Sequence, residues 1–168
     1  MRTNMRKIII GVMGPGKEAT KKDIENANEI GKLIAENDWI LLSGGRNSGV
    51  MDAVNQGAKS KKGLTLGILP NSDQSLISKY VDIAVFTNMS SGRNYINILS
   101  SDTIIACGIG PGTASEISLA LKEKKNVILL NDSDSSKEFF KSIGEDLTHV
   151  VDNPKEAIEK VKQILELV

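Results

Sequence analysis

The chain has 168 residues with 21 basic and 21 acidic side chains, so its formal net charge is zero. This balance, together with only one tryptophan, two tyrosines and three phenylalanines for base stacking, argues against a nucleic-acid partner. The length suits one domain with a sizeable core, and we expect a single domain over residues 1–168. The lone cysteine, Cys107, excludes an intrachain disulfide and indicates a reducing compartment.

The first apolar run, Lys7–Met13, follows a short basic segment and meets a Gly-Pro-Gly turn. A secretory signal would instead end at a small-residue cleavage site, so we interpret this run as the first strand and expect a cytoplasmic protein. No apolar segment approaches the roughly 20 residues that span a bilayer, so no membrane partner is expected.

Further short, β-branched runs follow, and several are apolar almost throughout, as strands covered on both faces are. With the first run, the expected strands are Lys7–Met13, Trp39–Ser43, Leu64–Leu69, Asp82–Thr87, Thr103–Cys107, Asn126–Leu130 and His149–Val151. Asn153-Pro154, with Glu156 behind it, predicts the capped start of a last helix. The apolar face of that helix comprises Ala157, Ile158, Val161, Ile164, Leu165 and Val168.

Alternation of strands and helices along the whole chain predicts an α/β fold. We expect a doubly wound, Rossmann-like parallel sheet of about seven strands with helices on both faces. Right-handed crossovers favour the strand order 3-2-1-4-5-6-7, with the switch point between the first and fourth strands. Ligands of such sheets bind beyond the carboxyl ends of the strands, near the switch point, so the functional residues should gather at that edge.

Glycine-rich turns follow four of the expected strands, in the segments GVMGPGKE, SGGRNSGVMDAVNQGA, TNMSSGRNYINIL and GIGPGTASE. Glycine lets the backbone approach a ligand closely and point N–H groups at it. A tight strand-to-helix connection alone would explain one such turn. Several turns at one edge of the sheet indicate a ligand site.

Two familiar nucleotide motifs are incomplete in this chain. The stretch GVMGPGK has the spacing of a P-loop, but Glu18 replaces the hydroxyl that holds magnesium, and Gly11 falls inside a strand. The same glycines suit a loose dinucleotide fingerprint, yet the second strand ends in Ser-Gly-Gly where a ribose-binding acid belongs. A nucleoside triphosphatase and a nicotinamide dehydrogenase are therefore disfavoured.

Arg93 and Glu116 form the candidate functional pair. Arg93 begins the helix after the fourth expected strand, where its charge opposes the helix dipole. A bound phosphate or an acidic partner would explain this arginine, and a solvated surface position is the alternative. Glu116 follows Thr113 at the spacing of a capping box, which would hold its carboxylate in the first turn of a helix. His149, the only histidine, lies at the opposite edge, so no histidine triad and no metal site are expected.

Two motifs together resemble the LOG-like ("lonely guy") superfamily, and the resemblance covers nearly the whole chain. The family signature Pro-Gly-Gly-x-Gly-Thr-x-x-Glu is similar to residues 108–116, GIGPGTASE, and the element Gly-Gly-x-x-x-Gly-(Leu/Val)-Met is similar to residues 44–51. By this resemblance Arg93 and Glu116 are the catalytic pair. The implied ligand- or phosphate-binding residues are Gly14, Gly16, Ser43, Gly44, Gly45, Gly49, Val50, Met51, Arg93, Asn94, Gly110, Pro111, Gly112 and Thr113.

The resemblance implies a homo-oligomer, a dimer or a tetramer, that binds a small phosphorylated ligand. The enzymes of the superfamily carry Met-His-x-Arg-Lys, whereas residues 89–94 here read MSSGRN, which looks closer to the branch of the molybdenum cofactor carrier proteins. We therefore expect binding of a phosphorylated nucleotide or pterin-type ligand, either the molybdenum cofactor or a nucleoside monophosphate, with no cofactor required. The alternative is a phosphoribohydrolase that cleaves the N-glycosidic bond of a nucleoside 5′-monophosphate, of the cytokinin riboside type, to base and ribose 5-phosphate.

Overall fold

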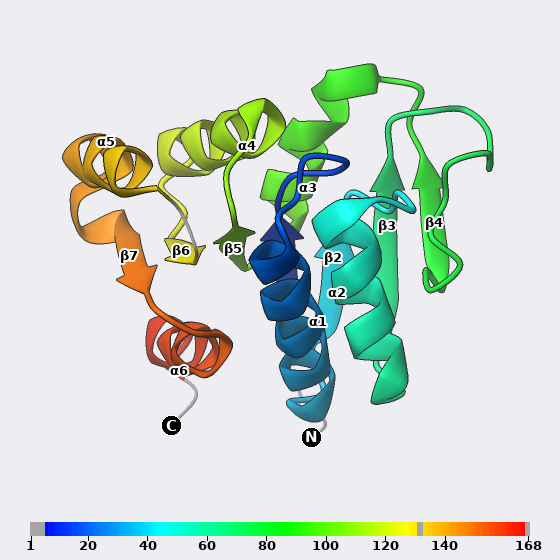
Figure 1. Ribbon diagram of the computed structural model, residues 1–168, viewed down its shortest axis with the longest axis horizontal. Coiled ribbons are helices and arrows are strands. Elements are labelled where there is room, and N and C mark those ends of the chain that lie inside the picture. The colour runs from blue at the N-terminus through cyan, green and yellow to red at the C-terminus, as the bar shows by residue number, and fades with distance from the viewer. Residues whose placement is uncertain (1–5, 131–132, 167–168) are drawn as a thin grey trace.

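One sheet of seven parallel strands organises the protein in the computed structural model, which describes residues 6–130 and 133–166 (Figure 1). The strands are β1 Ile9–Met13, β2 Ile40–Ser43, β3 Thr65–Leu69, β4 Ile83–Phe86, β5 Thr103–Cys107, β6 Val127–Leu130 and β7 Thr148–Val151. Their order in the sheet is β4-β3-β2-β1-β5-β6-β7. All seven predicted strands are present, and each lies within its expected limits except β7, which begins one residue earlier.

In the described part of the chain there are six α-helices, of which α1 to α5 connect strands and α6 follows β7. They are α1 Lys21–Glu36, α2 Gly49–Ser60, α3 Arg93–Ser100, α4 Pro111–Lys122, α5 Asp134–Gly144 and α6 Pro154–Ile164. The start of α6 is confirmed, because Asn153 Oδ1 accepts a hydrogen bond from the Glu156 N–H at 3.0 Å and Pro154 is the first helical residue. Val168, which we assigned to this helix, lies outside the described residues.

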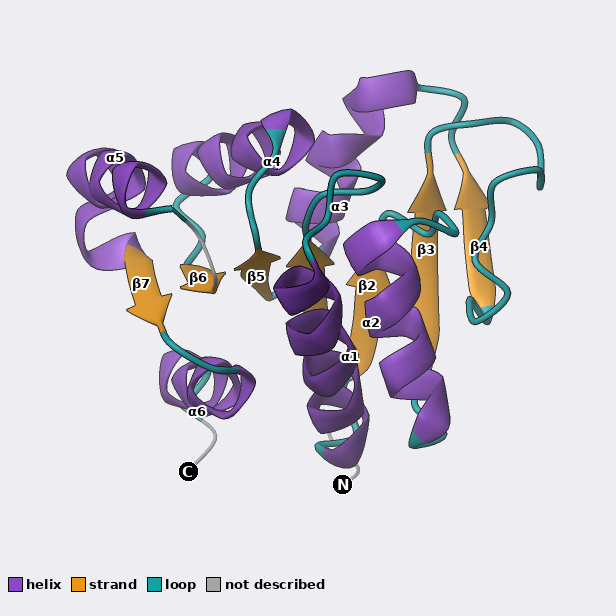
Figure 2. Ribbon diagram, viewed as in Figure 1, coloured by secondary structure: helices purple, strands orange, loops and turns teal. Residues whose placement is uncertain are grey.

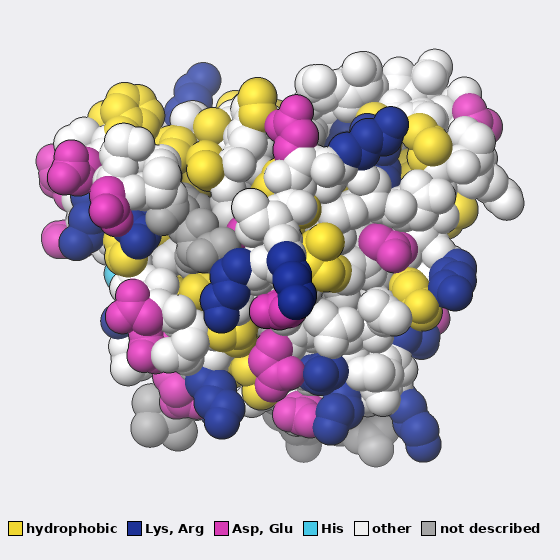
Figure 3. Space-filling model, in the orientation of Figure 1, with side chains coloured by type: hydrophobic (Ala, Val, Ile, Leu, Met, Phe, Trp, Pro, Cys, Tyr) yellow, Lys and Arg dark blue, Asp and Glu magenta, His cyan; other side chains and the backbone are white. Residues whose placement is uncertain are grey.

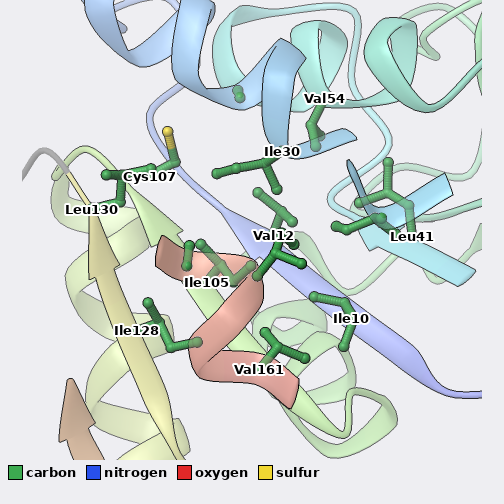
Figure 4. Packing of buried hydrophobic residues seen from close by; sticks show 14 of the residues in the cluster. Ile10, Val12, Ile30, Leu41, Val54, Ile105, Cys107, Ile128, Leu130 and Val161 are labelled. Carbon is green, nitrogen blue, oxygen red and sulfur yellow. The ribbon is translucent and has the colours of Figure 1, made fainter. Parts of the chain in front are cut away.

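The helices cover both faces of the sheet, as predicted. α1, α2 and α6 pack on one face, and α3, α4 and α5 pack on the other. Figure 4 shows the first of these two cores, with Ile10, Val12, Ile30, Leu41, Val54, Ile105, Cys107, Ile128, Leu130 and Val161. Each fully buried aliphatic side chain contributes roughly 1.5–3 kcal/mol. These two cores fix the strands, and with them the loops at the strand ends.

The position of β4 corrects the predicted strand order. β4 pairs with β3 at the outer edge of the sheet, and β5 is the strand that lies beside β1. Residues 70–82, between β3 and β4, form no helix, so the chain places β4 directly next to β3. α3 then carries the chain back to β5. The switch point therefore lies between β1 and β5, and not between the first and fourth strands.

At this switch point the two connections leave the sheet toward opposite faces. β1 leads through a loop to α1, and β5 leads to α4; the loops are drawn in teal in Figure 2. The β1–α1 loop ends in a capping box, in which Thr20 Oγ1 accepts from the Asp23 N–H at 3.1 Å and Asp23 Oδ2 accepts from the Thr20 N–H at 2.8 Å. The end of this loop is thereby fixed.

The surface in view in Figure 3 carries charges of both signs. In Figure 3 the basic and acidic side chains are interspersed over the face in view. Among the described residues, no helix combines the length and the apolar character that a membrane crossing needs.

Candidate functional site

A cleft of about 710 Å³ opens beyond the carboxyl ends of β1, β2, β3 and β5. Its walls are the loops and helix starts that follow the first five strands. A cavity of this size suits a small-molecule ligand, and its position is the one expected for a doubly wound sheet.

Close backbone packing holds the β1–α1 loop against the end of β5 and the start of α2. A Cβ at Gly14 would lie 2.5 Å from the Cys107 carbonyl oxygen at the end of β5. Gly49, with φ at +56°, is so close that a Cβ there would overlap a carbonyl oxygen of this loop. The Val50 N–H donates to the Pro15 carbonyl oxygen at 3.0 Å. The first glycine turn, the end of β5 and the start of α2 therefore form one continuous wall.

Arg93 begins α3 and is only 8% exposed. Its guanidinium lies over Gly44, where a Cβ would overlap Nη1 and lie 2.8 Å from Nη2, so a larger residue there would make the guanidinium shift. Arg93 Nε is buried without a hydrogen-bond partner, and within residues 6–130 and 133–166 no carboxylate forms an ion pair with this arginine. A buried charge without a partner is costly, and a bound anion would offset that cost.

Glu116 of α4 is 6% exposed and lines the same cleft. Burial raises the pKa of its carboxyl to about 7, against the opposing effects of a hydrogen bond from Asn97 and the positive charge of Arg93. Asn97 Nδ2 donates to Oε1 at 2.9 Å. With this pKa the group exists in both protonation states near neutral pH, so it can give or accept a proton.

The predicted capping box of Thr113 and Glu116 is wrong. α4 begins at Pro111 with Gly110 as its N-cap, and no side chain caps the helix. Proline suits the first helical position because its φ is preset and it has no N–H to leave unpaired, so the helix starts earlier than the Thr-x-x-Glu spacing indicates. Glu116 thus lies beyond the first turn and is held by Asn97 of α3.

The first turn of α4 presents an open surface to the cleft. Pro111, Gly112 and Thr113 all line it, and a Cβ at Gly112 would meet nothing within 4 Å. Thr113 Oγ1 is buried, and no described residue gives it a hydrogen-bond partner. The positive end of the helix dipole and its free N–H groups make this turn suitable for an anion.

Most residues of the predicted site line the cleft. Those that line it are Gly14, Gly16, Gly44, Met51, Arg93, Asn94, Gly110, Pro111, Gly112, Thr113 and Glu116. Four residues of the predicted site do not line the cleft, namely Ser43, Gly45, Gly49 and Val50. Ser43 Oγ, for example, accepts from Asn55 Nδ2 at 3.0 Å and from the Gly45 N–H at 3.1 Å, which shapes the end of β2.

Sequence reasoning missed the other lining residues, namely Val12, Met13, Pro15, Lys17, Glu18, Arg46, Pro70, Asn71, Ser72, Asp73, Asn88, Ser90 and Ser91. Residues 70–73 follow β3 at the same edge as the other loops, and this position was the available signal. Asn88 and Ser90 have φ values of +51° and +49°, a conformation uncommon outside glycine and often found at functional sites.

Cys107 and His149 do not line the cleft. Cys107 is fully buried in the core, with Sγ 3.4 Å from the Asp23 carbonyl oxygen. His149 of β7 has Nε2 2.8 Å from Asn126 Oδ1. Burial lowers the pKa of this histidine.

A model of the SLOG cluster4 family matches residues 7–158. The chain belongs to the SLOG cluster4 family. The match includes every strand and every loop of the cleft in this SLOG protein, and it confirms the LOG-like resemblance inferred from the two glycine motifs. A protein of Archaeoglobus fulgidus is 44% identical over 126 residues, which is 75% of this chain and 82% of that protein.

Solved structures resemble this SLOG protein along almost its whole length. The molybdenum cofactor binding protein of the phototrophic bacterium Rippkaea orientalis is 52% identical with a TM-score of 0.95, over 96% of this chain and 99% of that chain. The molybdenum cofactor carrier protein of Chlamydomonas reinhardtii is 48% identical with a TM-score of 0.92, over 96% and 99%. The Rossmann-like fold and the predicted likeness to the carrier branch are thereby confirmed.

Proposed function

We propose that the cleft binds the molybdenum cofactor, a phosphorylated pterin, and that the protein acts as a carrier for it. The observation that carries this proposal is the buried Arg93, which has no ion-pair partner among the described residues and faces the same cleft as the open first turn of α4. The two relatives at 52% and 48% identity, whose names state that they bind or carry this cofactor, support the choice of ligand.

The residues of the cleft fit a phosphate group. Arg93 Nε and Thr113 Oγ1 are two of the five buried side-chain polar atoms that lack a partner in the described part of the chain, and both residues line the cleft. Phosphate oxygens accept hydrogen bonds from a guanidinium and from a hydroxyl, and the free N–H groups at the start of α4 add further donors. The phosphate end of the ligand would thus satisfy both Arg93 and Thr113.

Part of the remaining lining is polar and suits the edge of a pterin ring. Asn71, Ser72 and Asn88 line the part of the wall that follows β3 and β4. Amide and hydroxyl side chains both donate and accept hydrogen bonds, as the edge of a pterin ring requires. In a carrier these residues hold and orient the cargo, and they need perform no reaction on it.

A retention experiment tests the proposal. The protein is mixed anaerobically with cofactor released from a purified molybdenum enzyme, and retained molybdenum is measured after gel filtration. Arg93→Gln should weaken retention at least tenfold, because a hydrogen bond to a charged group contributes about 1.5–3 kcal/mol.

Arg6→Gln is the matched control, since Arg6 pairs with Asp102 outside the cleft. Thermal unfolding of each variant shows whether it is folded. Failure of the wild-type protein to retain molybdenum, or equal losses in the two variants, would refute the proposal.

A second candidate function is supported by the pKa of Glu116. A carboxyl with a pKa of about 7 beside Arg93 could protonate a leaving base or orient water, as cleavage of a nucleoside 5′-monophosphate to base and ribose 5-phosphate requires. Chromatography for free base after incubation with a panel of nucleoside 5′-monophosphates tests it. Glu116→Gln should reduce base release about 100-fold or more. No release from any monophosphate would exclude this function.

We also propose that the chain forms a homo-oligomer, a dimer or a tetramer. The edge strand β4 and helix α3 expose large apolar side chains, namely Ile83, Val85, Phe86, Tyr95 and Leu99. A sheet edge with such side chains is usually covered by another chain or segment. Sedimentation equilibrium gives the mass directly, and a monomer at all micromolar concentrations would contradict this proposal.

A further inference from the structure

Arg46 is a cleft residue that has no role in the site described so far. It follows Gly44 and Gly45 at the end of β2 and lines the same cleft as Arg93. Among the described residues, no carboxylate forms an ion pair with it. Glu18 and Asp73 also line the cleft, and Asp73 Oδ1 instead accepts from the Ser75 N–H at 2.8 Å.

Backbone hydrogen bonds to residues 76–78 hold the residues before and after Arg46 in place. Arg46 pairs with Ile77 in an isolated antiparallel bridge. The Asn47 N–H donates to the Leu76 carbonyl oxygen at 2.9 Å, and the Ser78 N–H donates to the Gly45 carbonyl oxygen, also at 2.9 Å. The segment that carries Arg46 is therefore a fixed part of the cleft wall.

Arg46 and Arg93 line the same cleft. The Arg93 guanidinium lies over Gly44, two residues before Arg46 in the chain. Burial is the main cause of the lowered pKa of Arg93; Glu116 opposes this effect, and the positive charge of Arg46 adds to it. Two guanidinium groups that repel each other in this way destabilise the empty site, and an anion between them would remove that cost.

We infer that Arg46 and Arg93 form a two-arginine site for the phosphate of the ligand, with Arg46 binding oxygens that Arg93 leaves open. The inference rests on the proposed function, because it assigns the phosphate end of the same ligand. A phosphate monoester carries a charge of about −1.5 to −2 near pH 7 and three acceptor oxygens, enough for two guanidinium groups and the first turn of α4. The ligand class is therefore phosphate monoesters, and a dephosphorylated analogue should bind poorly.

Titration calorimetry with inorganic phosphate tests this site in the full chain. Arg46→Gln should weaken phosphate binding at least tenfold, and Arg46→Lys should restore part of the affinity, since lysine keeps the charge without the bidentate geometry. Lys21→Gln is the matched control, because Lys21 begins α1 at the same edge of the sheet but does not line the cleft.

If both arginines bind one phosphate, their effects are not additive. The double variant should then lose little more phosphate affinity than Arg93→Gln alone. Unchanged phosphate affinity in Arg46→Gln overturns the inference. Equal losses of phosphate affinity in Arg46→Gln and Lys21→Gln also overturn it, because they would mean that any positive charge near this edge of the sheet has the same effect. Thermal unfolding confirms that each variant is folded.

The molybdenum retention assay separates this inference from the proposed function. If the wild-type protein retains the cofactor and Arg46→Gln retains it equally, the carrier function stands and the two-arginine site is wrong. If phosphate binding depends on both arginines but no cofactor is retained, the site stands and the carrier function is wrong. A wild-type protein that binds neither ligand overturns both.

Discussion

Replacement of Glu116 by glutamine should stabilise the protein in a pH-dependent way. The folded protein keeps the proton on this buried carboxyl up to about pH 7, whereas the unfolded chain releases it near the ordinary value of 4.5. The unfolded state therefore binds fewer protons between these two values, and stability falls as the pH rises through this window. Glutamine has the same shape, can still accept the hydrogen bond from Asn97, and does not ionise.

The size of the effect follows from the pKa difference. Raising the pKa from 4.5 to about 7, at 1.36 kcal/mol per pH unit, destabilises the ionised form by about 3 kcal/mol above pH 7. Part of this loss is already present at pH 5, so the free energy of unfolding of Glu116→Gln relative to wild type should increase by about 2.5 kcal/mol between pH 5 and pH 8.5. Any cost of the new amide that does not depend on pH cancels in this difference.

Urea denaturation of both proteins at the two pH values measures this difference, provided that the m-values agree. Glu138→Gln is the matched control, because Glu138 is an exposed residue of α5 and its replacement should show no such gap. A stability difference between Glu116→Gln and wild type that is the same at pH 5 and pH 8.5 would refute the reasoning. It would mean that Glu116 is as well solvated in the folded protein as in the unfolded chain.

Three further substitutions follow from the described contacts. Thr20→Ala removes the hydroxyl that caps α1 and should lower the free energy of unfolding by about 1 kcal/mol in urea denaturation. Ile128→Ala leaves a cavity in the core beneath α6 and should cost about 2–5 kcal/mol by the same measurement, against about 0.5–1.5 kcal/mol for Ile128→Val. Gly44→Ala places a methyl group against the Arg93 guanidinium and Met51 Sδ, so the guanidinium must shift and phosphate binding should weaken in calorimetry; unchanged affinity would show that the guanidinium position is unimportant.

The strands were predictable because their signal is local. Thr103–Cys107 is buried throughout and its limits match the expectation. The place of β4 in the sheet was not predictable in the same way, because it depends on the path of residues 70–82, which contain no helix to cross the sheet. β4 also has exposed side chains, as an edge strand does, although its apolar sequence resembles that of an inner strand. Strand identity is thus a property of a few residues, and strand order is a property of the connections.

For the candidate site, the glycines could be found because their turns follow strands at one edge of the sheet, and Arg93 because its charge opposes the helix dipole at the start of α3. Gly14 and Gly44 both have neighbours that a Cβ would meet. Arg46 was not singled out, because the direction in which a loop side chain points depends on contacts with a distant segment, here the bridge to Ile77. The misplaced capping box at Thr113 has a similar cause, since motif spacing alone does not show where a helix begins.

The wall of the cleft is joined largely through the main chain. The Val50 N–H to Pro15 carbonyl bond and the Ser78 N–H to Gly45 carbonyl bond persist whatever side chains these residues carry, apart from the glycines that allow the close approach. Substitutions elsewhere on the wall can therefore alter which chemical groups face the cavity without displacing its frame. Duplicated copies of such a gene can diverge toward new ligands by exchanging side chains, while the architecture that holds them is inherited unchanged.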